Sequence, residues 1–131
     1  MSIDAIVGGQ WGDEGKGKIV DLFSRDANLV ARFQGGANAG HTVYKDDKKI
    51  ILHQIPSGIL SDNCQCILGN GMVIDPVGLV EELGMLANND IHYHGSIYIA
   101  ANAHIVTPVH KWIDLKSEEN SNQKIGTTCR G

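Results

Sequence analysis

Two glycine-rich segments carry the residues of this sequence that are best suited to chemistry. The first, residues 6–18, reads Ile-Val-Gly-Gly-Gln-Trp-Gly-Asp-Glu-Gly-Lys-Gly-Lys, and from Gly12 to Lys18 it has the G-x-x-x-x-G-K spacing of phosphate-binding loops. Backbone N–H groups in such a loop, together with the start of a following helix, bind phosphate. The second segment, residues 34–42, reads Gln-Gly-Gly-Ala-Asn-Ala-Gly-His-Thr and places His41 among small residues. Both segments therefore favour a nucleotide-phosphate site.

The first loop departs from the usual phosphate loop in two ways. Ile19 stands where Ser or Thr normally supplies a hydroxyl to Mg²⁺, so the ligands of any metal must come from elsewhere. The loop also contains Asp13 and Glu14, and a carboxylate beside polyphosphate is repelled unless it binds a metal or takes a proton from a substrate. Asp13 is our candidate for that role. The alternative is a tight turn whose acids and lysines are merely solvated.

The elements around these loops predict a βαβ unit. Residues 3–5 begin a short apolar run that predicts a strand, and residues 28–33 predict a second one. Between them lies a helix with one apolar face, made by Ile19, Leu22 and Phe23. A βαβ connection makes the two strands parallel, so the loops that follow them leave from the same edge of the sheet. We therefore expect His41 to approach Asp13.

Further elements follow the second loop. A hairpin is predicted from residues 42–44 and 49–53, which flank a charged turn at Asp46 and Asp47. Residues 64–68 predict a strand that ends at Gly69-Asn70-Gly71, and residues 72–74 read as a core strand.

The last third of the sequence predicts two helices and one more strand. The first helix begins at Asp75-Pro76 and has an apolar stripe of Leu79, Val80, Leu83, Leu86 and Ala87. Residues 96–101 predict a strand. The second helix begins at Thr107-Pro108 and carries Val109, Trp112 and Ile113, after which residues 116–122 read as a solvated connection.

Composition narrows the class of protein. The 131 residues suit one α/β domain with a mostly parallel sheet, flanking helices and a β-hairpin. A net charge of −4 with scattered Lys and Arg gives no footprint for nucleic acid, and no apolar run or leader predicts membrane insertion. Three cysteines, an odd number, favour a reducing, cytoplasmic environment.

Smaller clusters are better explained by structure than by chemistry. His92 and His94 have the spacing of a metal pair but no third ligand nearby, and Cys64 and Cys66 are expected to be small buried residues. We expect His53 and His104 to be structural or supporting, and Cys129 to be an inert thiol.

The sequence closes on Gly126-Thr127-Thr128-x-Arg130-Gly131, which offers N–H groups, hydroxyls and a guanidinium to an anion. Because no element follows this motif, we expect the chain to be a fragment of something longer.

Together these motifs closely resemble the adenylosuccinate synthetase family. The resemblance rests on residues 10–18, residues 34–42, His53-x-Ile-Pro-Ser-Gly58, Gly69-Asn-Gly71 and the closing motif, all in the order and spacing of the family. It implies that residues 1–131 are the N-terminal part of a GTP- and IMP-binding domain. The implied enzyme is a ligase that forms adenylosuccinate from IMP and L-aspartate and converts GTP to GDP and phosphate. The implied route is a 6-phosphoryl-IMP intermediate in purine biosynthesis, in a cytoplasmic homodimer that uses Mg²⁺.

The resemblance also assigns roles by position. Asp13 corresponds to the base that takes the N1 proton of IMP, His41 to the general acid, and Lys16 to a further catalytic residue. The Mg²⁺ ligands are Asp13 and the carbonyl of Gly40. Contacts with the GTP phosphates fall on Gly12, Asp13, Glu14, Gly15, Lys16, Gly17, Lys18, Gly40, His41 and Thr42. Contacts with IMP fall on Asp13, Glu14, Gly15, Lys16, Asn38, Ala39, Gly40, His41 and Thr128.

Two other functions stay open at this point. One is a phosphate-loop NTPase that hydrolyses nucleotide without IMP, against which Ile19 counts. The other is a nucleotide-binding module without catalysis. The family's guanine-reading segment, its aspartate loop and the arginine that it donates across the dimer all lie beyond Gly131, so we expect this chain alone to be inactive.

Overall fold

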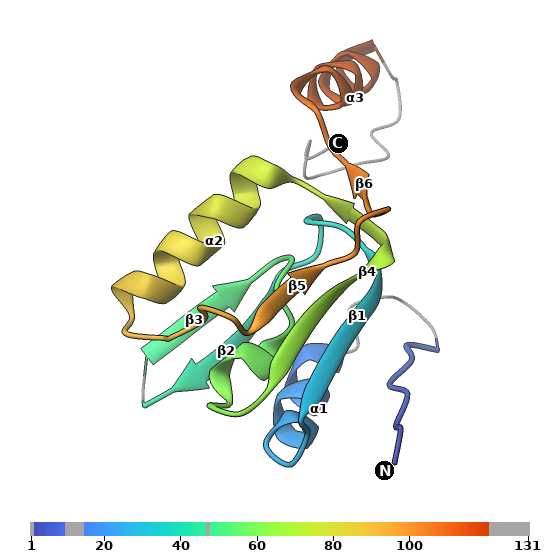
Figure 1. Ribbon diagram of the computed structural model, residues 1–131. Helices are drawn as coiled ribbons and strands as arrows, with labels where there is room; N and C mark the ends of the chain where they lie inside the picture. Colours follow the sequence, from blue (N-terminus) through green and yellow to red (C-terminus); the bar gives the residue numbers. More distant parts are fainter. Residues whose placement is uncertain (1, 10–14, 47, 121–131) are drawn as a thin grey trace.

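The computed structural model describes residues 2–9, 15–46 and 48–120 (Figure 1). Its helices and strands, in chain order, are α1 (Lys16–Ser24), β1 (Leu29–Gly35), β2 (His41–Lys45), β3 (Lys48–Leu52), the 3₁₀ helix η1 (Ser57–Leu60), β4 (Gln65–Ile74), α2 (Pro76–Asn88), β5 (Ile97–Ile99), β6 (His104–Ile105) and α3 (Pro108–Asn120).

The main sheet is parallel. Its strand order is β1-β4-β5, with β6 paired to the far end of β4, and every one of these pairings is parallel. Strands β2 and β3 form a separate antiparallel hairpin in which His41 faces Leu52. The predicted α/β class, with a mostly parallel sheet, flanking helices and a hairpin, is confirmed.

The hydrophobic core lies on one face of this sheet. Alternate residues of β4 point to that face and are completely or almost completely buried: Cys66, Leu68, Met72 and Ile74. The hairpin and α2 cover them, contributing Val43, Ile50, Leu52, Leu79 and Leu86 to the same cluster. Because the side chains of a strand alternate between the two faces of a sheet, the β4 residues adjacent to these four point away from this core.

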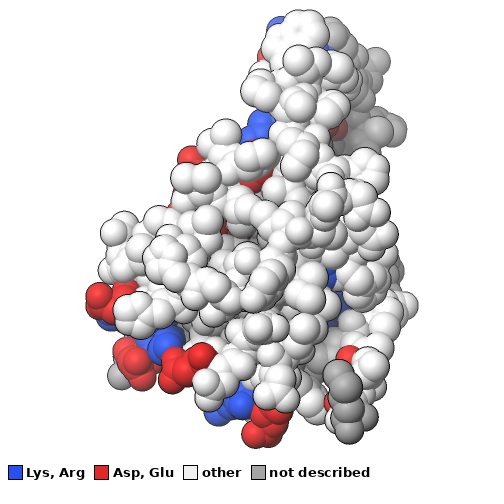
Figure 2. Space-filling model, in the orientation of Figure 1, with Lys and Arg blue, Asp and Glu red and all other residues white. Residues whose placement is uncertain are grey.

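The opposite side of the sheet, which we call the open face, has no covering layer among the described residues. Leu29 and Phe33 of β1, Val73 of β4 and Tyr98 of β5 lie on it and are between 40% and 55% exposed. Figure 2 views the molecule with β1, β4 and β5 toward the reader, and most of the surface on this side is uncharged. Charged side chains gather instead along the lower edge of that view.

The predicted first strand does not form. Residues 2–9 have no ladder partner in the structure, and Ile3 and Val7 are 90% and 73% exposed. A strand is stable only where a neighbour takes its backbone hydrogen bonds, and an apolar run cannot reveal whether that neighbour is present. Strand β1 makes its parallel pairing with β4 instead, so the predicted βαβ partner was wrong.

The predicted strand end at Gly69-Asn70-Gly71 was also wrong, because β4 continues through these residues to Ile74. A Cβ at Gly71 would stand 2.5 Å from the carbonyl oxygen of Phe33, and one at Gly69 would stand 3.1 Å from the Phe33 Cα. The register between β1 and β4 shifts at this point, between Arg32 and Gln34. The glycines therefore allow two backbones to approach closely at a bulge rather than marking a turn.

Helix α2 begins where predicted, with Asp75 as its N-cap residue and Pro76 in its first turn, although the Asp75 side chain makes no capping bond. Its buried stripe differs from the prediction. Leu79 and Leu86 are buried, whereas Val80 is 67% exposed and Ala87 is exposed too. The charged Glu82 takes the buried position instead, at 5% exposure.

Helix α3 starts after Thr107 as predicted and runs through Lys116 to Asn120, so the predicted connection there is helical up to that residue. Its apolar residues Val109, Trp112 and Ile113 are 62%, 61% and 51% exposed. The apolar face of α1 formed as predicted but is likewise open, with Ile19, Leu22 and Phe23 exposed.

Candidate functional site

The start of α1 has the features of an anion site. Gly15 precedes the helix with a φ of 82°, a left-handed conformation that glycine adopts without strain, and as the N-cap residue it has no side chain to cap the helix. Lys16 and Lys18 lie in the first turn, where the helix dipole is positive. The predicted helix after the glycine-rich loop is thus confirmed.

The second loop meets this helix end. A Cβ added to Gly17 would stand 2.6 Å from the Cβ of His41 and 2.9 Å from its Cδ2, so the imidazole packs directly on the first turn of α1. The hydroxyl of Ser57, on η1, donates to the carbonyl of Gly17 at 3.3 Å. His41 and the described end of the first segment, at Gly17, are therefore neighbours, and α1 and the hairpin bring them together rather than two adjacent parallel strands. The expected approach of His41 to Asp13 lies outside the described residues.

The imidazole of His41 is neutral at physiological pH. Burial lowers its pKa to about 4, and electrostatic interactions with Arg32 and His53 act in the same direction. Its Nε2 is buried and makes no hydrogen bond within the described part of the chain. A neutral imidazole in this position can make one hydrogen bond to a ligand, and a bound anion would raise the pKa of His41 again.

The loop between β1 and β2 is held at both ends. The Nη2 of Arg32 donates to the carbonyl of Gly36 at 2.8 Å. At the other end, a Cβ on Gly40 would stand 2.7 Å from the Cε1 of His53. Asn38 and Ala39 lie exposed between these two anchors, where a ligand could reach them.

Several predicted site residues lie outside the described residues, and the structure does not test them: Gly12, Asp13, Glu14 and Thr128. The expectation that Cys129 is an inert thiol falls outside the described residues too. The described ranges contain no group of three or more His, Cys, Asp or Glu side chains that could hold a metal ion. The two predicted Mg²⁺ ligands, the carboxylate of Asp13 and the carbonyl of Gly40, are hard oxygen donors of the kind this ion takes. As a donor set they fit Mg²⁺.

Sequence reasoning missed the charged residues beside the loop. Arg32 and Glu82 lie on opposite sides of the chain turn at residues 53–55, and both make hydrogen bonds to its backbone. Next to this turn is a cavity of about 360 Å³ lined in part by Gln54, Asp75 and Lys111. The signals in the sequence were the charged Arg32 inside an apolar strand and the charged Glu82 inside the apolar stripe of a helix.

The smaller clusters behave as predicted where the structure describes them. Cys64 and Cys66 are buried free thiols, and burial raises the pKa of Cys66 to about 12, which makes the thiolate inaccessible. His92 and His94 stand in a loop, where the His94 ring packs on Tyr93. No helix in the described ranges has the length and apolar composition needed to cross a membrane.

Comparison with known proteins gives one consistent result. The family model of adenylosuccinate synthetase matches residues 5–131. The adenylosuccinate synthetase of Chlorobium chlorochromatii (strain CaD3) is 51% identical over 127 residues, which cover 96% of this chain and 29% of that protein. That of Synechococcus sp. (strain RCC307) is 52% identical over 132 residues, covering 100% of this chain and 30% of that protein. The chain thus spans about 30% of the length of these curated relatives.

Solved structures agree. A fully ligated adenylosuccinate synthetase from Plasmodium falciparum superposes with a TM-score of 0.82 at 44% identity, covering 92% of this chain and 28% of that one. The succinoaminodeoxyadenylate synthetase of cyanophage S-2L, solved with dGMP and dATP, gives a TM-score of 0.63 at 25% identity, covering 82% of this chain and 30% of that one.

Proposed function

This chain belongs to the adenylosuccinate synthetase family, and on that premise we propose that it forms the phosphate-binding part of a ligase. The proposed reaction joins IMP to L-aspartate and converts GTP to GDP and phosphate, through 6-phosphoryl-IMP. The AMP branch of purine biosynthesis is the corresponding pathway.

The observation that carries this proposal is the contact between His41 and Gly17. It puts a half-buried imidazole, whose buried Nε2 has no hydrogen-bond partner among the described residues, against the positive end of α1. Phosphoryl transfer needs cationic groups and donors placed where charge develops, and little covalent chemistry from the protein. Lys16, Lys18 and the first turn of α1 supply the cationic side, and His41 supplies a hydrogen bond at its edge.

In the proposed reaction Asp13 takes the N1 proton of IMP, and the resulting 6-oxyanion attacks the γ-phosphorus of GTP. The bond from this phosphorus to the β–γ bridging oxygen breaks, and GDP leaves. The amine of L-aspartate then attacks C6, and phosphate departs with the former O6 of IMP. The chemical reason is that a carbonyl oxygen is a poor leaving group and a phosphate ester oxygen is a good one.

His41 is proposed to stabilise the phosphoryl group in transfer. The neutral ring donates one hydrogen bond, and its pKa rises when polyphosphate binds beside it. Asn38, Ala39 and Gly40 are proposed to contact IMP, with Thr42 on the GTP side. Gly12, Glu14, Gly15 and Thr128 complete the proposed contacts with GTP and IMP.

Mg²⁺ is the proposed cofactor, with Asp13 and the carbonyl of Gly40 as protein ligands. When bound, it would neutralise phosphate charge and polarise the group in transfer. We further propose that the enzyme works in the cytoplasm as a homodimer, and that it acts without nucleic acid or membrane.

Phosphate release from GTP tests this proposal, measured on the intact protein that carries this sequence, with IMP and L-aspartate omitted one at a time. We expect release only when both are present, and none from the 131-residue chain by itself. GTP consumption without IMP would instead support an NTPase. Thermal stabilisation by nucleotide without turnover would support a binding module.

A further inference from the structure

The backbone of His53 and Gln54 is held from two sides by opposite charges. On one side, the Glu82 carboxylate of α2 accepts the N–H of His53 and, at 3.0 Å from each oxygen, the N–H of Gln54. On the other side, the Nη1 of Arg32 on β1 donates to the carbonyl of His53 and, at 3.3 Å, to that of Gln54. Two side chains therefore bind both the donors and the acceptors of this dipeptide.

This arrangement is costly for a purely structural device. Glu82 is 5% exposed, and burying a carboxylate is unfavourable unless charge and hydrogen bonds compensate. Burial raises the pKa of Glu82, while the backbone N–H groups of residues 53–55 oppose that rise by binding the ionised form. Burial also lowers the pKa of Arg32, and the charge of Glu82 opposes that change. Apolar packing of α2 on the turn would avoid these costs, but it would fix no hydrogen-bond geometry.

The same residues reach the loop that carries the proposed IMP contacts. The second nitrogen of the Arg32 guanidinium, Nη2, binds the carbonyl of Gly36 at 2.8 Å, where the loop begins. The His53 ring closes against Gly40, where the loop ends, so closely that a Cβ there would stand 2.7 Å from it. His41 follows directly. Arg32 therefore holds the start of the loop directly, and the turn that it binds holds the end of the loop through the His53 ring.

Gln54 extends the arrangement toward α2. Its side chain makes two hydrogen bonds with the backbone of Asp75, accepting from N at 2.8 Å and donating to O at 3.0 Å. The turn is thereby tied to the start of the helix that carries Glu82. The loop, the turn and α2 are linked by polar contacts that would not tolerate a displacement of about 1 Å.

We propose that Arg32 and Glu82 are positioning residues of the site: they clamp the 53–54 backbone and, through it, hold the loop of residues 36–41 in the conformation that binds IMP. The identity of the ligand rests on the proposed function. The clamp itself rests on the contacts above.

Glu82→Gln tests the clamp, and Glu81→Gln is the matched control. Both substitutions remove one negative charge from α2 at adjacent positions, but Glu81 is exposed. Glutamine at position 82 turns one acceptor oxygen into an NH₂ group that opposes the backbone N–H groups. In the intact protein we expect Glu82→Gln to raise the KM for IMP about tenfold, the loss of one charge-assisted hydrogen bond, with a smaller change in the KM for GTP. Glu81→Gln should leave both constants within twofold of the parent.

A nuclear magnetic resonance readout on the same variants needs no turnover. We expect Glu82→Gln to shift the amide resonances of residues 36–41 and to speed hydrogen exchange at His53 and Gln54, neither of which Glu81→Gln should do. Arg32→Lys keeps the charge, but the lysine side chain cannot bind Gly36 and the turn together, so this substitution should reproduce these changes. In the double variant, the effects of Arg32→Lys and Glu82→Gln should be smaller than the product of the two single effects. Arg32→Lys also tests the clamp if Glu82→Gln does not fold.

Two results would overturn the proposal. One is Glu82→Gln with lower thermal stability but a KM for IMP like that of Glu81→Gln, since Glu82 would then only stabilise the fold. The other is unchanged amide resonances in residues 36–41 for both Glu82→Gln and Arg32→Lys. If the parent protein shows no reaction with IMP, the proposed function fails, and the resonances alone decide for or against the clamp.

Discussion

At the scale of single residues, His41 is the group whose behaviour depends most on its surroundings. Its place in a glycine-rich loop could be read from the sequence, but its ionisation could not. Burial, Arg32 and His53 together lower its pKa, and those residues are distant in the chain. Where a residue's chemistry is set by such neighbours, sequence reasoning identifies the residue and misses its charge state.

The pKa of His41 makes a prediction about stability. In the folded state it titrates near pH 4, and in the unfolded state near the ordinary value of 6.5. Between these two pH values the unfolded state therefore binds more protons than the folded state. The contribution of neutral His41 to stability is lost as pH falls from about 6.5 to about 4. We expect His41→Asn to make the fall in urea midpoint between pH 7 and pH 4.5 shallower, while His92→Asn, at an exposed position, should leave it unchanged. Equal slopes in all three proteins would contradict the assignment.

Gly17 gives a second prediction at this scale. In Gly17→Ala the new methyl group would collide with the His41 ring, so we expect weaker GTP binding by calorimetry even though alanine favours helix. Gly84→Ala is the control, because nothing lies within 4 Å of its added Cβ in the interior of α2. It should stabilise the fold by about 0.5–1 kcal/mol and leave GTP binding intact. Unchanged GTP affinity in Gly17→Ala would show that the His41 contact is dispensable.

At the scale of elements, the patterns that depend on local chemistry were predictable. Helix α2 begins at Asp75-Pro76, the hairpin turns at Asp46, and α1 follows the glycine-rich loop, all as the sequence indicated. The predictions were wrong where residues distant in the sequence determine the local structure. Gly71 permits a close approach of β1, and Ile3 lacks a strand neighbour.

Helix α2 shows the same limit in its burial. Hydrophobicity predicts that Val80 is buried and Glu82 exposed, whereas the structure shows the reverse. Glu82 is buried because the turn at residues 53–55 offers N–H groups to its carboxylate. The two glycine-rich segments could be located from the sequence. The clamp that holds them required the fold.

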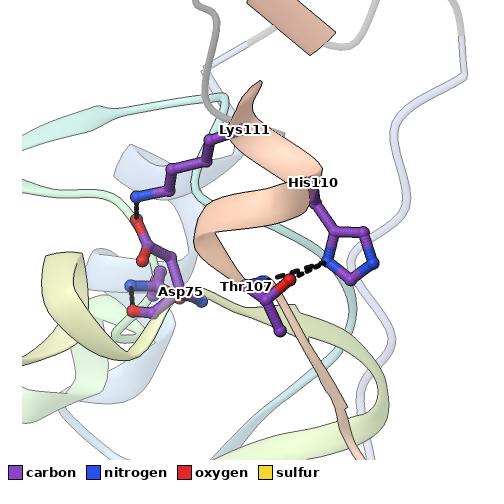
Figure 3. Close-up of polar contacts among 5 residues, drawn as sticks. Asp75, Thr107, His110 and Lys111 are labelled. Atoms are coloured by element: carbon purple, nitrogen blue, oxygen red, sulfur yellow. Dashed lines mark hydrogen bonds and ion pairs between the residues drawn. The ribbon is translucent and has the colours of Figure 1, made fainter. Parts of the chain in front are cut away.

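An ion pair between Lys111 and Asp75 links α3 to the start of α2, and it gives a third prediction. Figure 3 shows the Lys111 side chain reaching Asp75, at 2.6 Å, while His110 turns back to Thr107. Asp75 is 6% exposed, so Lys111→Met would leave a buried carboxylate without its counter-charge. We expect faster amide hydrogen exchange throughout α3 and a loss of about 1–3 kcal/mol in stability.

Lys116→Met is the matched control for that experiment. Lys116 makes an ion pair of the same length, 2.6 Å, on the same helix, but both partners are about half exposed. Such surface pairs contribute about 0–1 kcal/mol. Equal effects of the two substitutions would mean that Asp75 does not hold α3.

At the scale of the whole molecule, the described residues leave apolar surface on several sides: the open face of the sheet, the outer face of α1 and the length of α3. Extensive exposed apolar surface normally marks an interface. We predict that the 131-residue chain by itself self-associates in sedimentation velocity. Phe33→Lys combined with Val73→Lys on the open face should reduce the association, and Val77→Lys, at an exposed position of α2, should not. A monomeric chain at all concentrations would contradict this reading.

In the proposed reaction O6 of IMP receives the γ-phosphoryl group of GTP, so this oxygen atom should end in the released phosphate. IMP labelled with heavy oxygen at O6 would be given to the intact protein together with GTP, L-aspartate and Mg²⁺, and the released phosphate examined by mass spectrometry. We expect one labelled oxygen in each phosphate formed. Phosphate whose fourth oxygen comes from water would contradict it, because GTP would then have been hydrolysed without phosphorylating IMP.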